Sequence, residues 1–209
     1  MVSGELTIFI VDDDDAIRES LALLLESAGY AAQAFSSGTT FLSNLRSSAE
    51  GCLLIDVQMP EMDGLEVQQE LNRRGVALRV IVMTGHADVP LAVRAMKAGA
   101  FDFIEKPFAD EAMLASVARA LALVNEARDE QAETLTIRDR AALLTAREHE
   151  VLNQLVAGHP NKVIAFHLSI SPRTVEIYRA RVMEKMKARS LSELVRMTLR
   201  ARLSPATMD

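Results

Sequence analysis

Acidic, hydroxyl and amine side chains follow short apolar runs in the first half of the chain. The residues that share this placement are Asp12, Asp13, Asp56, Thr84 and Lys106. If the apolar runs are parallel strands, their carboxyl ends lie along one edge of a sheet, and these side chains can converge there. Converging carboxylates repel one another, which raises their pKa unless a cation is present.

A cluster of carboxylates suits Mg²⁺, which takes few protein ligands and also accepts phosphate oxygens. The ion would neutralise charge during phosphoryl transfer and orient Asp56 for attack on phosphorus. Thr84 offers a hydroxyl, and Lys106 offers a positive charge for phosphate oxygens. Because acidic residues after strands are also common helix caps, Asp14 and Asp15 are interpreted as caps.

Five apolar runs alternate with five amphipathic stretches over the first 125 residues or so, which predicts a parallel sheet covered by helices. The predicted strands are Leu6–Val11, Ala31–Phe35, Cys52–Asp56, Arg79–Met83 and Phe101–Glu105. The predicted helices are Ala16–Ala28, Gly38–Arg46, Gly64–Arg74, Val89–Ala98 and Asp110–Val124. This order predicts a flavodoxin-like, doubly wound α/β fold with its site beyond the strands' carboxyl ends.

The segments VDDD, LLIDVQMPEMDG, VIVMTGH and MKAGAFDFIEKPF resemble the receiver domain of two-component response regulators, over residues 5–125. The resemblance implies that Asp56 is the phosphoacceptor and that Thr84 and Lys106 contact the phosphoryl group. It implies Mg²⁺ ligands at Asp13, Asp56 and the backbone carbonyl of Gln58, with Asp12 alongside through water. Phe103 matches the family's switch aromatic, which is more often tyrosine.

Charge and composition divide the chain. Residues 1–135 carry 10 Lys/Arg against 22 Asp/Glu, whereas residues 136–209 carry 13 against 7, and a basic second half favours a polyanionic partner. Neither Gly nor Pro occurs between Phe108 and Ala157, so residues 125–140 are predicted to be a helical linker, with a partly frayed connector as the alternative. The predicted domains are residues 1–124 and 141–209.

The second domain shows closely spaced helix start and stop signals. Capping-box patterns at Thr145–Glu148 and Ser190–Glu193 open its first and last helices. A short helix over Lys162–Leu168 precedes Ser171-Pro172, which supplies an N-cap and a first-turn proline for a helix over residues 171–187. Four short helices predict an all-α bundle whose middle pair has helix-turn-helix proportions.

The helix over residues 171–187 is predicted to read DNA. Its core stripe is Val175, Tyr178, Val182 and Met186. Its opposite face and flanks carry arginines, carboxylates and small apolar groups that can contact base edges: Arg173, Glu176, Ile177, Ala180 and Arg181. Lys162, Thr174 and Lys185 are placed to bind phosphates. The alternative is an ordinary solvated helix face.

The segments PNKVIAFHLSISPRTVE and VMEKMKARSL make the second domain similar to the four-helix output domain of LuxR/NarL-type regulators, in particular the FixJ subgroup. Tyr178 stands where the family usually has histidine. This resemblance implies phosphorylation by a sensor histidine kinase, homodimerisation, binding to double-stranded promoter DNA and activation of RNA polymerase, at promoters of oxygen-limited or symbiotic metabolism. The expected dimer face is Val89–Ala98 with Phe101–Glu105.

Several other classes are disfavoured. We expect a cytoplasmic protein without a membrane segment, and no enzyme beyond its own phosphotransfer and slow dephosphorylation. Cys52 is interpreted as a buried hydrophobe, and four scattered histidines without a cysteine cluster do not predict zinc. Two alternatives stay open: a Mg²⁺-dependent aspartyl phosphatase, and a regulator controlled through the acidic pocket without phosphorylation.

Overall fold

The computed structural model describes residues 6–86 and 88–203 of the 209-residue chain, so the predicted outer domain limits at residues 1 and 209 lie outside it. The chain divides into two compact units, Met1–Glu126 and Ala127–Asp209. Among the helices in the described ranges, none is long and apolar enough to cross a bilayer.

The first unit contains a five-stranded, fully parallel sheet in the order β2-β1-β3-β4-β5. The strands are β1 (Thr7–Val11), β2 (Ala31–Phe35), β3 (Gly51–Asp56), β4 (Arg79–Thr84) and β5 (Asp102–Glu105). The predicted flavodoxin-like fold is therefore confirmed, with strand ends that differ from the prediction by one residue. Every residue of the central strand β3 is buried, as expected for a strand covered on both faces.

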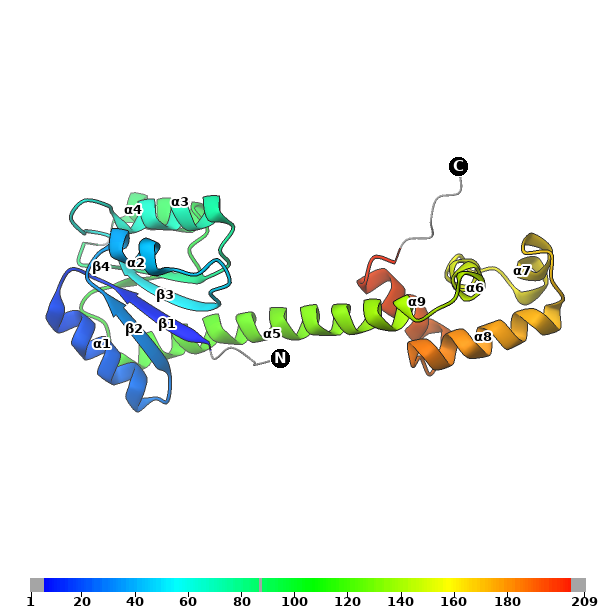
Figure 1. Ribbon diagram of the computed structural model, residues 1–209. Helices are drawn as coiled ribbons and strands as arrows, with labels where there is room; N and C mark the ends of the chain where they lie inside the picture. The colour runs from blue at the N-terminus through cyan, green and yellow to red at the C-terminus, as the bar shows by residue number, and fades with distance from the viewer. Residues whose placement is uncertain (1–5, 87, 204–209) are drawn as a thin grey trace. The chain divides into compact units, whose positions relative to one another are not determined.

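Helices cover both faces of this sheet (Figure 1). They are α1 (Asp15–Ser27), α2 (Gly38–Asn44), α3 (Gly64–Arg74), α4 (Val89–Lys97) and α5 (Asp110–Ala142). Alternation along β3 sends Leu53 and Ile55 into one core with α2, α3 and α4, and Cys52 and Leu54 into the other with α1 and α5. Both cores hold the sheet rigid beneath its carboxyl edge.

The predicted fifth helix and the predicted helical linker form one continuous helix, α5, over 33 residues. The absence of Gly and Pro from this stretch allows the helix to continue. Ile137 lies in the range predicted as linker, yet its side chain is 2% exposed and belongs to the second hydrophobic core. The last turns of α5 are thus part of the second unit's packing.

The second unit adds four short helices: α6 (Ala146–Val156), α7 (Asn161–His167), α8 (Pro172–Met186) and α9 (Leu191–Arg200). Thr145 and Glu148 form the predicted capping box of α6. At α9 the prediction needs a correction. Ser190 Oγ accepts from the Glu193 N–H, but the Glu193 carboxylate accepts at 2.7 Å from the N–H of Arg189, the residue before the N-cap, in place of the Ser190 N–H that a capping box uses.

Candidate functional site

The acidic residues of the first unit meet at the carboxyl edge of its sheet. Val11 pairs with Ile55 across β1 and β3, so Asp12 continues β1 at the level of Asp56. Lys106 follows β5 directly, and its backbone N–H donates to the Thr84 carbonyl at 2.7 Å. Parallel pairing therefore delivers residues that are far apart in the sequence to one end of the sheet.

Lys106 links the two carboxylates. Its Nζ lies 2.6 Å from Asp12 Oδ2 and 2.5 Å from Asp56 Oδ1, which are charge-assisted hydrogen bonds. Asp12 is 1% exposed and Asp56 is 5% exposed, so both carboxylates have lost most of their water. The structure thus brings together three of the residues that the sequence predicts as the site.

Burial and charge act in opposite directions on this cluster. Burial raises the pKa of the Asp56 carboxyl above its ordinary value, although the hydrogen bond and the charge of Lys106 lower it; the neighbouring Asp12 raises it further. Burial alone would lower the pKa of the Lys106 ammonium, but its hydrogen bonds to Asp12 and Asp56 raise it above its ordinary value. One ammonium therefore only partly neutralises two buried carboxylates.

The donor set fits a hard divalent cation. Asp13 and Gln58 lie at the same edge and are exposed, and the Gln58 backbone N–H donates to the Asp56 carboxylate. In the described part of the chain, no three His, Cys, Asp or Glu side chains gather closely enough to enclose a metal ion. Mg²⁺ keeps several waters and needs only one or two carboxylates, so the under-neutralised Asp56 is compatible with it.

Thr84 ends β4 next to the cluster, and Phe103 lies on the neighbouring strand β5. The Thr84 side chain is fully buried, and its Oγ1 lies 3.2 Å from both the N–H and the carbonyl of His86. Phe103 is partly buried and packs against the core on the α2–α3–α4 face of the sheet. Neither side chain has a hydrogen bond to Asp56 in the described interactions.

Two residues that the sequence prediction missed shape the same edge. Arg18 Nη1 donates to the Asp12 carbonyl at 2.7 Å, and the same guanidinium pairs with Asp15. A Cβ on Gly64 would lie 2.3 Å from the carbonyl oxygen of Asp56, so only glycine allows α3 to start here. Arg18 lies four residues after the N-cap Asp14, a spacing that could have indicated its position on the turn facing β1.

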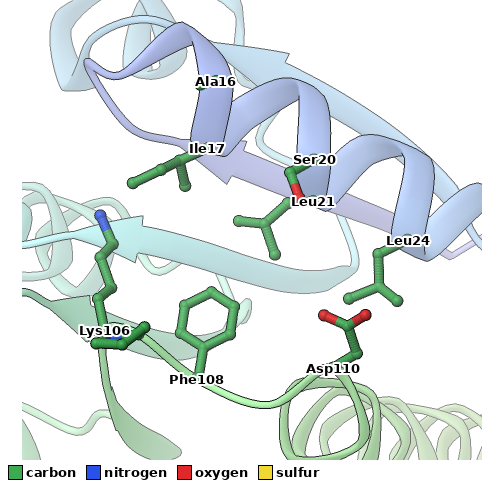
Figure 2. A pocket seen from close by; sticks show the side chains of 9 residues that line it. Ala16, Ile17, Ser20, Leu21, Leu24, Lys106, Phe108 and Asp110 are labelled. Atoms are coloured by element: carbon green, nitrogen blue, oxygen red, sulfur yellow. The ribbon is translucent and has the colours of Figure 1, made fainter.

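An apolar hollow of about 460 Å³ lies beside Lys106. Figure 2 shows its walls, which come from α1 on one side and from the β5–α5 connection on the other. Ile17, Leu21 and Leu24 line the first wall, and Phe108 and Asp110 line the second. The acidic edge of the sheet is therefore bordered by a surface on which apolar side chains are accessible.

In the second unit, helix α8 has the predicted two faces. Val175, Val182 and Met186 are fully buried, and Tyr178 is partly buried against the same core. The outward residues are exposed: Arg173, Glu176, Ile177, Ala180 and Arg181. Arg181 Cζ lies 6.0 Å from the centroid of the Tyr178 ring, which is a cation–π contact between the two residues.

The three residues predicted to bind phosphates differ in their surroundings. Lys162 is exposed on α7. Thr174 is partly buried, with its hydroxyl 2.8 Å from Ser171 Oγ. Lys185 is paired within the domain: its Nζ lies 2.6 Å from the buried Glu148 carboxylate and 3.1 Å from the Leu143 carbonyl. Its charge is therefore directed toward α6.

Two family models match the chain, one on each side of the boundary between the two compact units. Residues 8–118 match the response regulator receiver domain, and residues 142–198 match the bacterial regulatory proteins of the luxR family. The first match covers the sheet with its acidic edge. The second covers the bundle that contains α8.

Relatives extend over nearly the whole chain. The transcriptional regulatory protein FixJ of Azorhizobium caulinodans is 53% identical over 96% of this chain and 95% of its own length. Full-length FixJ from B. japonicum is 45% identical, covers 94% of this chain and 97% of its own, and superposes with a TM-score of 0.59. The response regulator StyR is 39% identical, covers 92% and 98%, and has a TM-score of 0.79. The chain therefore belongs to the two-component response regulators of the FixJ subgroup, which join a receiver domain to a LuxR-type DNA-binding domain.

Proposed function

We propose that this transcription regulator is switched by phosphorylation of Asp56 by a sensor histidine kinase. The observation that carries the proposal is the contact of Lys106 with both Asp12 and Asp56 at the sheet edge. The chain would act on no other substrate and catalyse only its own phosphotransfer and dephosphorylation. A phosphodonor that reaches Asp56 would lie next to the apolar hollow between α1 and Phe108.

In the proposed transfer, a carboxylate oxygen of Asp56 forms a bond to phosphorus while the phosphorus–nitrogen bond of the donor histidine breaks. Lys106 exchanges its contact with Asp56 for a phosphoryl oxygen and so remains neutralised. Asp13, Asp56 and the Gln58 carbonyl would hold Mg²⁺, with Asp12 alongside. When bound, Mg²⁺ would offset the negative charge that gathers on the phosphoryl oxygens.

The phosphorylated receiver is proposed to dimerise. Thr84 would turn from the His86 backbone toward the phosphoryl group, which leaves room for Phe103 to move inward. The α4 surface supports this proposal, because Val89, Val93 and Met96 expose 76%, 44% and 50% of their surface. Such an apolar face on one helix is typical of a surface that becomes buried in an assembly.

Two output domains held together would place two α8 helices in successive major grooves, about 34–36 Å apart. Arg173, Ile177 and Arg181 would contact base edges, and Lys162 would contact phosphates. We propose activation of RNA polymerase at the bound promoter as the outcome, which run-off transcription with phosphorylated and unphosphorylated protein tests.

Replacement of Asp56 tests the whole scheme. Asp56→Asn should abolish labelling by acetyl phosphate, dimerisation in gel filtration with beryllofluoride, and the accompanying rise in DNA affinity. Asp129→Asn, which changes an exposed carboxylate on α5, is the matched control and should behave as wild type. If Asp56→Asn is still labelled at the wild-type rate, the phosphoacceptor lies elsewhere.

A further inference from the structure

Two histidines that are separate in the sequence meet on the surface of the output domain. His159 lies in the turn after α6, and His167 is the last residue of α7. Both Nδ1 atoms lie 2.8 Å from the same atom, Oε1 of Gln154 on α6. The two rings stand edge to face at 89°, with their centroids 5.1 Å apart.

We propose that His159, His167 and Gln154 form a binding site for a divalent transition metal ion of the zinc, cobalt or nickel class. Imidazole nitrogens suit these ions, and an amide oxygen can complete such a set. This site is in the second unit and is independent of the acidic pocket of the receiver.

The ring spacing already agrees with shared coordination. A metal–nitrogen bond of about 2.0–2.1 Å at a tetrahedral angle places the centroids of two ligating imidazoles about 5 Å apart. The observed centroid distance of 5.1 Å needs no large movement of either ring. Both Nδ1 atoms now lie 2.8 Å from the Gln154 oxygen, so an ion bound to them would sit closer to the rings than this oxygen does. The oxygen would then need to withdraw by about 1 Å to keep a metal–oxygen distance of about 2.0–2.2 Å.

A backbone hydrogen bond holds two of the three proposed ligands, Gln154 and His159, close together. The His159 N–H donates to the Gln154 carbonyl at 3.1 Å, so these residues are joined by main chain as well as side chain. His159 is partly buried and His167 is exposed, which leaves the site open to an ion from solution. Ligation through Nδ1 moves each ring proton to Nε2, which remains available to water.

A bound ion would cross-link α6 to the carboxyl end of α7. Helix α7 packs beside α8, so the ion would stabilise the helix pair that we propose to bind DNA. In the absence of metal, the same atoms are held together by hydrogen bonds to one carbonyl oxygen, which are individually weaker than metal–ligand bonds.

The test uses the full chain without an added histidine tag, in excess Mg²⁺ so that the acidic pocket does not take up the probe. Isothermal titration calorimetry with Zn²⁺ as the only transition metal should show that one zinc ion binds per chain. His159→Ala or His167→Ala should abolish this binding, and Gln154→Ala should weaken it about tenfold or more. His149→Ala removes a histidine outside the pair and is the matched control.

A second measurement needs no variant. The chain has four histidines, and Zn²⁺ should shift the imidazole nitrogen resonances of His159 and His167 but not those of His86 and His149. The proposal is overturned if the wild type binds no zinc in stoichiometric amount. It is equally overturned if His149→Ala lowers the affinity as much as His159→Ala, or if all four histidines shift alike.

Discussion

The Lys185 ammonium on helix α8 donates to the carboxylate of Glu148 on α6 at 2.6 Å. The Glu148 side chain is 3% exposed, whereas that of Lys185 is 35% exposed. The hydrogen bond from Lys185 is the main reason that the pKa of Glu148 is lowered to about 2, with a further contribution from the Thr145 backbone. The ion pair therefore joins α8 to α6 within the second unit.

Lys185→Met should destabilise the output domain at neutral pH by about 1–2 kcal/mol, because it leaves the buried Glu148 carboxylate without its lysine partner, while the partial exposure of Lys185 limits the loss. The folded-state pKa of Glu148 lies below its ordinary value of 4.5. The stabilisation is thus present above about pH 4.5 and is lost as the pH falls toward about 2. The effect of Lys185→Met should shrink over the same range.

Tyrosine fluorescence can report the unfolding of the output domain separately from that of the receiver. The chain has two tyrosines and no tryptophan, and Tyr178 lies in the output domain, so a Tyr30→Phe background leaves one probe. Urea unfolding from about pH 7 down to about pH 3 gives the free energy of unfolding. A Lys185→Met effect that is the same at both ends of this range would contradict the assignment to the Glu148 pair.

The two lysines predicted to bind phosphates should differ in DNA binding. Lys162→Ala should weaken all duplexes alike and reduce the slope of log affinity against log salt by about 1, because an exposed ammonium is removed. Lys185→Ala should leave that slope unchanged, since its charge is held by Glu148. Fluorescence anisotropy over a salt series separates the two, and equal slopes for both variants would refute the distinction.

Side chains on the outward face of α8 should control sequence discrimination. Arg181→Ala should reduce the preference for the operator over unrelated DNA by about 1–3 kcal/mol while affecting unrelated DNA less. Arg196→Ala removes an exposed arginine from α9 and serves as the control. Competition binding with both duplexes measures the preference. A uniform loss of affinity for both duplexes would mean that Arg181 contacts only phosphates.

Ile137 should be essential for the output domain although it lies in the connecting helix. Ile137→Ala should lower the free energy of unfolding of this domain by about 2–5 kcal/mol, because a side chain that is 2% exposed leaves a cavity. Leu135, two residues earlier, is 50% exposed, and Leu135→Ala should cost much less. The Tyr178 fluorescence assay applies, and similar losses for both variants would exclude a specific core role.

Lys106→Met should slow labelling of Asp56 by acetyl phosphate about tenfold or more, because the only ammonium in contact with this carboxylate in the described structure is lost. Lys97→Met, at an exposed position on α4, should have the wild-type rate. Phosphate-affinity electrophoresis over time measures both rates. An unchanged rate in Lys106→Met would show that phosphoryl transfer does not need this contact.

Much of the fold could be predicted from local pattern. Helix α3 has the predicted bounds Gly64–Arg74. Its start is set by a capping box and its end by Gly75, and both features involve only residues within or next to the helix. The strand ends that carry Asp12, Asp56 and Lys106 could be predicted because parallel topology places every strand end of this kind at one edge. The sequence could not predict whether Asp12 or Asp13 would contact Lys106, since both residues follow the same strand.

By itself, the sequence determined the order of elements, the parallel sheet covered by helices and the nature of the acidic edge, because hydrophobic periodicity and capping depend on residues close in the chain. Only the tertiary structure decided that Lys185 faces Glu148 and that Ile137 enters the second core. It also placed the Nδ1 atoms of His159 and His167 within hydrogen-bonding distance of the same oxygen atom, Oε1 of Gln154. Such contacts depend on how separate helices pack, and long side chains can reach several partners until that packing selects one.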